Sequence, residues 1–130
     1  LMCYGDSDMD RPVAFVVADE KKCTAWADAN GVEYGTFADL CATDAMNKEV
    51  LGSLVKAGKS GKLGANEILA GILLLPGTGP KDNETPQFED PWTPENGALT
   101  ASNKLQRRVI KQAYGEATGK FEGLKAKGIR

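Results

Sequence analysis

The basic residues Lys104, Arg107 and Arg108 lie close together in the stretch LTASNKLQRR. Ser102 is a typical N-cap residue, so the pattern predicts a helix over Asn103–Tyr114 that begins with these cations. The dipole of a helix disfavours cations at its start by about 0.3–1 kcal/mol each. Free N–H groups and cations at one helix start attract anions, so the stretch predicts an anion-binding site; the alternative is an ordinary solvated terminal helix.

The charges of the chain are unevenly divided. Residues 1–103 carry 8 basic and 16 acidic side chains, whereas residues 104–130 carry 8 basic and 2 acidic ones. A basic C-terminal segment on an acidic body predicts an anionic partner. The chain has no histidine, which excludes Ser-His and Cys-His catalysis and removes the commonest metal ligand.

The three cysteines, Cys3, Cys23 and Cys41, are widely spaced and form no CxxC pair. This spacing predicts neither a disulfide framework nor a zinc site, so no metal site is expected. We interpret the cysteines as small buried hydrophobes of a protein in a reducing, intracellular compartment, with the organelle left open. The chain begins with Leu1 rather than methionine, and we expect it to be a piece of a longer protein.

The N-terminal third predicts a hairpin and a helix. Two apolar, β-prone segments, Leu1–Tyr4 and Pro12–Val17, flank a polar turn and are typical of a β-hairpin. Asp19 is a suitable N-cap for a helix over Glu20–Ala29, which an Asn-Gly pair would end.

The middle of the chain predicts a second helix, a short third one and a strand. Thr43 or Asp44 would cap a helix that ends at Gly58. A short helix is expected at Glu67–Ala70 and a buried strand at Gly71–Leu75. The second helix carries an apolar stripe that we assign to the core: Met46, Val50, Leu51, Leu54 and Val55.

Residues 76–97 are rich in proline, glycine and polar side chains, which predicts a long surface loop. Phe88 and Trp92 would fix this loop to the body, and the basic tail 116–130 is expected to be partly frayed. The order of elements predicts an α+β fold. We expect a short antiparallel sheet, made of the N-terminal hairpin and an additional strand, packed by three to four helices.

The run WTPENGALTASNKLQRR resembles the closing motif of the long-chain acyl-CoA synthetases, a family of the adenylate-forming superfamily. Thr93–Thr100 and Asn103–Arg107 match its two halves, and Lys104 falls on the catalytic lysine of the superfamily. The segments CYGDS, RPVAFVVAD and GKLGANEILAGILLLPG resemble further parts of the same region. The sequence departs from the family pattern at Ala98, Asn103 and Gln106.

The resemblance implies that residues 1–130 are the C-terminal lid domain of a long-chain fatty acid–CoA ligase. Such an enzyme joins a fatty acid to AMP and then to CoA, using ATP, Mg²⁺ and CoA, and Lys104 would serve the first step. The implied partner is the enzyme's own N-terminal adenylation domain, against which the lid swings between the two steps. The fragment alone is expected to be inactive and to bind none of these cofactors, and its cofactor-binding residues are not identified.

Other interpretations remain open. Arg107 and Arg108 either steer ATP, contact the large domain or are solvated helix residues. The turn Tyr4–Ser7 either approaches the active site or serves only the hairpin. The alternative function is a non-catalytic anion-binding module, in which the basic C-terminal helix binds nucleic acid or acidic membrane; the acidic body and the lack of interleaved aromatics disfavour nucleic acid. A protein-interaction piece without catalysis is a third interpretation. Peripheral membrane association of the full-length protein is left open.

Overall fold

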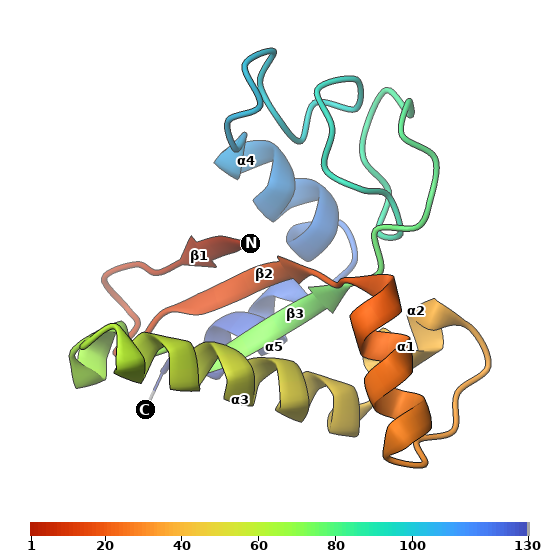
Figure 1. Cartoon of the computed structure of the whole chain (residues 1–130). Coiled ribbons are helices and arrows are strands. Elements are labelled where there is room, and N and C mark those ends of the chain that lie inside the picture. Colours follow the sequence, from red (N-terminus) through yellow and green to blue (C-terminus); the bar gives the residue numbers. More distant parts are fainter. Residues whose placement is uncertain (130) are drawn as a thin grey trace.

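The apolar segments of the chain form one three-stranded sheet in the computed structural model, which describes residues 1–129 (Figure 1). The strands are β1 (Met2–Tyr4), β2 (Val13–Val17) and β3 (Gly71–Leu75), in the order β1-β2-β3. β1 runs antiparallel to β2, with Met2 opposite Phe15, which confirms the predicted hairpin. β3 runs parallel to β2, with Leu73 opposite Phe15.

The sheet is therefore mixed, and the prediction of an antiparallel sheet is wrong for its third strand. The reason is the connection between β2 and β3. It contains three helices, and a crossover of this kind returns the chain to the end of the sheet from which β2 started. The α+β class itself is confirmed.

Within residues 1–129, five α-helices surround the sheet, rather than the three to four that were expected. They are α1 (Glu20–Ala29), α2 (Phe37–Ala42), α3 (Asp44–Ser60), α4 (Arg107–Ile110) and α5 (Phe121–Ala126), with a 3₁₀ turn η1 (Ala65–Glu67) and a π-helical segment η2 (Lys111–Glu116). α1 has the predicted bounds, and its Asp19 cap accepts a hydrogen bond from Lys22 N at 3.1 Å.

Three helix predictions need correction. α2 was not predicted, although Thr36 and Asp39 form a reciprocal capping box at its start. α3 begins after the Thr43 cap as predicted, but it continues through Gly58 to Ser60. The prediction of a helix at Glu67–Ala70 is wrong, because the 3₁₀ turn η1 ends at Glu67 and the following residues lead into β3.

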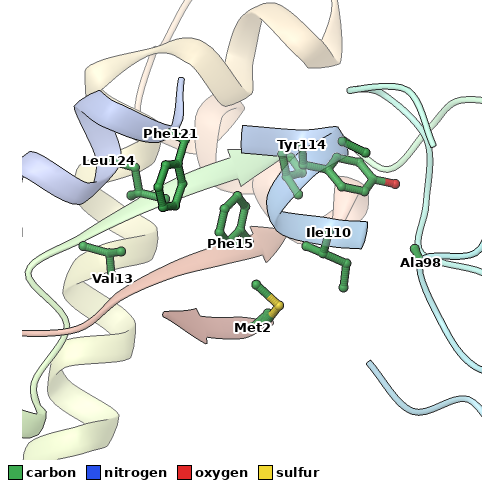
Figure 2. Packing of buried hydrophobic residues seen from close by; sticks show 10 residues of the cluster. Met2, Val13, Phe15, Ala98, Ile110, Tyr114, Phe121 and Leu124 are labelled. Atoms are coloured by element: carbon green, nitrogen blue, oxygen red, sulfur yellow. The ribbon is translucent and has the colours of Figure 1, made fainter. Parts of the chain in front are cut away.

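Alternate residues of β2 and β3 face opposite sides of the sheet and form two apolar clusters. On one side Ala14 and Val16 pack with residues of α1, α2 and α3. The predicted α3 stripe lies here, with Met46 buried and most of the other stripe residues partly buried against the cluster. On the other side Phe15 packs with η2 and α5 through Tyr114 and Phe121, as Figure 2 shows.

The connection between β3 and α4 holds no helix or strand, apart from an isolated bridge between Leu99 and Leu105. It carries the two buried polar side chains of the described chain, Asp90 and Asn96, each 1% exposed. Phe88 and Trp92 are partly buried and pack against the cluster that contains Phe15, as expected. Part of the tail 116–130 forms α5, and Arg130 lies outside the described residues.

Candidate functional site

Lys104 lies in a small β-hairpin before α4, not in a helix. The helix predicted from Asn103 begins at Arg107, and Ser102 does not cap it. Residues 98–106, here called the Lys104 hairpin, pair through a bridge between Leu99 and Leu105. The idea of a lysine at a helix start is therefore wrong, and only the two arginines occupy the first turn of α4.

The tip of the Lys104 hairpin is held by Thr100. Thr100 N donates to Lys104 O at 2.8 Å, and Thr100 Oγ1 accepts from Lys104 N at 3.1 Å. Asn103 N donates to Thr100 O at 2.9 Å, and Asn103 has a φ of +63°, in the left-handed region that asparagine tolerates better than most residues. These contacts fix the backbone of Lys104 from both sides.

The Lys104 side chain is exposed, and within residues 1–129 its ammonium has neither an ion pair nor a hydrogen bond. Two other lysines of the basic segment differ in this respect: Lys111 Nζ lies 3.3 Å from Glu116 Oε1, and Lys125 Nζ lies 2.9 Å from Asp6 Oδ2. Lys104 thus combines a fixed backbone with an ammonium that is free to meet an anion from outside this chain.

The base of the Lys104 hairpin rests on Asn96. Ala98 N donates to Asn96 Oδ1 at 3.0 Å, while Ala98 O accepts from Gln106 N at 2.9 Å. Asn96 Nδ2 donates to Pro91 O at 2.7 Å. Thr93 and Asn96 also bond reciprocally, Thr93 N to Asn96 Oδ1 at 3.3 Å and Asn96 N to Thr93 Oγ1 at 3.2 Å.

The loop before the hairpin is held by a second buried group. The Asp90 carboxylate accepts from Asn83 Nδ2 and from Gln87 N, both at 2.7 Å. Tyr114 OH donates to Asp90 O at 2.8 Å and lies 3.3 Å from Pro91 O. Burial raises the pKa of Tyr114, so its hydroxyl remains a donor. Sequence reasoning missed both buried polar residues, Asp90 and Asn96; the available signal is that both lie within EDPWTPEN, a polar segment that also carries a tryptophan.

Arg107 and Arg108 face a groove that Lys104 does not line. The groove, about 390 Å³ in volume, lies between β1 and the start of α4 and is lined by Met2, Cys3, Tyr4, Gly5, Arg107, Arg108 and Lys111. Arg107 Nη1 donates to Cys3 O at 2.9 Å, which ties α4 to the edge of the sheet. The structure therefore separates the three predicted cations into a lysine hairpin and an arginine groove.

The turn after β1 is bound to α5. Tyr4 OH donates to Asp6 Oδ2 at 2.9 Å, and Lys125 Nζ contacts the same oxygen. The hydrogen bond from Lys125, followed by that from Asp8 N, lowers the pKa of the Asp6 carboxyl. These contacts account for Tyr4 and Asp6 by packing within the chain.

The cysteines do not form a reactive centre. Cys23 and Cys41 are buried, as predicted, and burial raises the pKa of Cys41 to about 12. Cys3 is exposed, so the prediction of a buried cysteine is wrong there, because residue 3 points away from the core on the three-residue edge strand.

Residues 1–129 contain no cluster of three or more histidine, cysteine or acidic side chains placed to hold a metal ion. In the same part of the chain, no helix has the length and hydropathy that a membrane crossing needs.

Three relatives illustrate what the chain is similar to. Long chain acyl-CoA synthetase 8 of Arabidopsis thaliana is 36% identical over 121 residues, which cover 93% of this chain and 15% of that protein. Long-chain-fatty-acid–CoA ligase 2 of Schizosaccharomyces pombe is 30% identical over 87% of this chain and 15% of that protein. Long-chain-fatty-acid–CoA ligase 6 of Homo sapiens is 29% identical over 85% of this chain and 14% of that protein.

The chain thus spans about 15% of the length of the relatives it matches. No protein-family model matches it, and no solved structure matches it. Near-complete cover of this chain and slight cover of the relatives are consistent with a fragment of a longer enzyme.

Proposed function

We propose that this chain, which is similar to long-chain acyl-CoA synthetases over nearly its whole length, is the C-terminal lid domain of such an enzyme. The whole protein would be an ATP-dependent fatty acid–CoA ligase. Its N-terminal adenylation domain, outside this chain, would bind the substrates, and this fragment alone would be inactive.

The reaction has two steps, both of which involve anions. In the first, an oxygen of the fatty acid carboxylate attacks the α-phosphorus of ATP, and pyrophosphate leaves. In the second, the thiol of CoA loses its proton and attacks the acyl carbon of acyl-AMP. The new carbon–sulfur bond replaces the carbon–oxygen bond to AMP, which leaves. The first step brings a carboxylate against a triphosphate, so it needs a cation between them.

Lys104 would provide that cation. Its ammonium would lie between the carboxylate and the α-phosphate, reduce their repulsion and stabilise the charge that develops as the bond forms. One well-placed donor of this kind contributes about 3 kcal/mol. The observation that carries the proposal is the exposed, unpaired Lys104 ammonium on a backbone fixed by Thr100.

Other parts of the active site would lie outside this chain. Residues 1–129 hold no cluster of three or more acidic, cysteine or histidine side chains placed for a metal ion. In this proposal the Mg²⁺ that accompanies ATP is bound by the N-terminal domain. After adenylation the lid would swing and take Lys104 away from the reacting groups, as conformational steps do in many enzymes.

The free thiols fit a reducing, intracellular location, which we include in the proposal.

The test uses the full-length protein that contains this chain, with Lys104→Ala and, as a matched control, Lys56→Ala on the exposed face of α3. Adenylation is measured by pyrophosphate exchange, and thioester formation is measured from preformed acyl-AMP. Lys104→Ala is expected to lower exchange by about 100-fold or more while the second step continues. Unchanged exchange in Lys104→Ala, or an equal loss of both steps, would contradict the role of Lys104.

A further inference from the structure

We propose that Asn96 is a positioning residue for Lys104, so that this buried side chain sets the rate of the adenylation step without touching a substrate. The inference rests on the proposed function of Lys104. Asn96 lies eight positions before the lysine and is 1% exposed. It belongs to neither the Lys104 hairpin nor a helix or strand, yet its side chain bonds to the base of the hairpin.

The buried residue Ala98 joins Asn96 to the base of the Lys104 hairpin. Its N–H bonds to Asn96 Oδ1, and its carbonyl oxygen accepts from Gln106 N, which closes the hairpin. Ala98 is 0% exposed and faces the core beside Ile110 and Tyr114 (Figure 2). Water cannot replace Asn96 as the partner of this N–H without opening the core, so loss of the side chain leaves a buried donor unsatisfied.

A continuous path of paired backbone runs from Ala98 to Lys104. Gln106 N and Ala98 O pair at the base, Leu99 and Leu105 form the bridge, and Thr100 bonds Lys104 at the tip. A change in the direction of the Ala98 peptide is therefore carried to Lys104 through the paired backbone of the hairpin.

Asn96 is itself anchored to the loop that precedes it. Its Nδ2 donates to Pro91 O at 2.7 Å, and Thr93 bonds it on both its backbone and its side chain. Thr93 Oγ1 in turn donates to Lys81 O at 2.7 Å, and Thr93 O accepts from Leu99 N at 3.2 Å. Asn96 thus connects the loop at residues 91–93 to the base of the Lys104 hairpin.

This arrangement predicts an effect on one half-reaction. Catalysis by a positioned group is sensitive to displacements of about 1 Å, which can cost 100-fold in rate. The thioester step, in which Lys104 has no proposed part, does not depend on the hairpin in this way. A purely structural role for Asn96 would instead lower both steps together.

The experiment measures both half-reactions in the full-length protein with Asn96→Ala, Asn96→Asp and the control Asn47→Ala. Asn47 is part-buried in α3, and its Nδ2 donates to Cys41 O and Thr43 O at 2.7 and 2.8 Å, so the control also removes side-chain bonds to the backbone. Asn96→Ala is expected to lower pyrophosphate exchange about 10- to 100-fold, with the thioester step within about 3-fold of the parent. Asn96→Asp keeps the acceptor for Ala98 N and is expected to recover part of the exchange rate.

A double variant separates this inference from the proposed function. If Asn96 acts through Lys104, adding Asn96→Ala to Lys104→Ala lowers exchange no further. A further fall by the full Asn96→Ala factor would overturn the inference. If Lys104→Ala lowers exchange but Asn96→Ala behaves like Asn47→Ala, the inference fails and the proposed function stands; if Lys104→Ala has no effect, the proposed function itself fails.

A second variant and a second readout cover poor folding of Asn96→Ala. Thr93→Val removes the hydroxyl that accepts from Asn96 N and donates to Lys81 O, and it retains the Asn96 side chain itself. This variant is expected to lower pyrophosphate exchange selectively, by a smaller factor than Asn96→Ala. In the full-length Thr93→Val protein, amide hydrogen exchange should be faster than in the parent for peptides covering residues 98–106 and unchanged in β2. An equal loss of both half-reactions in Thr93→Val, with unchanged amide hydrogen exchange at residues 98–106, would contradict the proposal.

Discussion

The hydroxyl of Tyr114 donates a hydrogen bond to the carbonyl oxygen of Asp90 at 2.8 Å, and it thereby joins the π-helical segment η2 to the loop that precedes the Lys104 hairpin. Tyr114 is 0% exposed and packs beside Phe15 and Ile110 in the cluster of Figure 2. One side chain therefore serves both the apolar core and the polar loop. The loop, although it lacks helices and strands, is part of the folded body.

We expect Tyr114→Phe to lower the free energy of unfolding of the 130-residue chain by about 1–2 kcal/mol. The ring remains in the core, but the buried Asp90 carbonyl loses its partner. Urea unfolding measures the change. Tyr4→Phe is the matched control, because Tyr4 OH bonds the partly exposed Asp6 carboxylate, and its expected cost is smaller. Equal costs for the two variants would contradict the importance of the Asp90 contact.

The Asp6–Lys125 contact predicts a bell-shaped pH dependence. Hydrogen bonding lowers the pKa of Asp6 from its ordinary value of 3.8 and raises that of Lys125 from 10.5. A lowered carboxyl pKa stabilises the fold above about pH 4 and loses this effect as pH falls; a raised lysine pKa stabilises it below about pH 10 and loses this effect as pH rises. Thermal unfolding of the parent and of Asp6→Asn should differ most between these limits.

The control for this pair is Asp82→Asn, which removes an exposed carboxylate from the distant loop. Its stability difference from the parent should be small throughout. A difference between the parent and Asp6→Asn that stays constant from pH 3 to pH 7 would show that the Asp6 carboxylate does not act through its lowered pKa.

The cysteines predict a simple pattern of chemical labelling. Cys3 is exposed, whereas Cys23 and Cys41 are buried and their pKa values are raised by burial. Thiolates rather than thiols react with maleimides, so at pH 8 only Cys3 should be modified rapidly in the folded chain. Mass spectrometry after brief labelling should find one adduct, and three after denaturation. Rapid modification of Cys41 in the folded chain would contradict its placement in the core.

Local signals in the sequence were sufficient for most of the sheet and for two helices. β1, β2 and β3 follow from short apolar runs, and α1 and α3 follow from their caps, Asp19 and Thr43. The direction of β3 depends on where three connecting helices pack, which no local pattern states. The six-residue α2 is too short to show helical periodicity, and the capping box at its start is the one sequence signal that indicates it.

The candidate site shows the same limit. Ser102 has the side chain of an N-cap, but the left-handed Asn103 and the bonds of Thr100 turn the segment into a hairpin. The resemblance predicted Lys104 as the site lysine, but no pattern in the sequence predicted the hairpin in which it lies. Asp90 and Asn96 were assigned to a surface loop because composition gives polarity but not the backbone partners that allow burial.

Substitution of glycine by alanine is expected to have opposite effects on stability at Gly97 and at Gly52. Gly97 lies between Asn96 and Ala98 with a φ of +81°, a conformation that alanine adopts only with strain, although a Cβ there would meet no atom within 4 Å. Gly52 lies within α3, also with open space around a Cβ, and its φ is not positive. Gly97→Ala should therefore destabilise the chain by about 1–2 kcal/mol, whereas Gly52→Ala should stabilise it by about 0.5–1 kcal/mol.

Urea unfolding of the two variants checks these signs, and Gly97→Asn should cost less than Gly97→Ala because asparagine tolerates the left-handed region better. In the full-length protein, Gly97→Ala should also lower pyrophosphate exchange more than the thioester step, since the strain falls at the base of the Lys104 hairpin. A stabilising Gly97→Ala would mean that the left-handed backbone at Gly97 does not hold the base of the Lys104 hairpin.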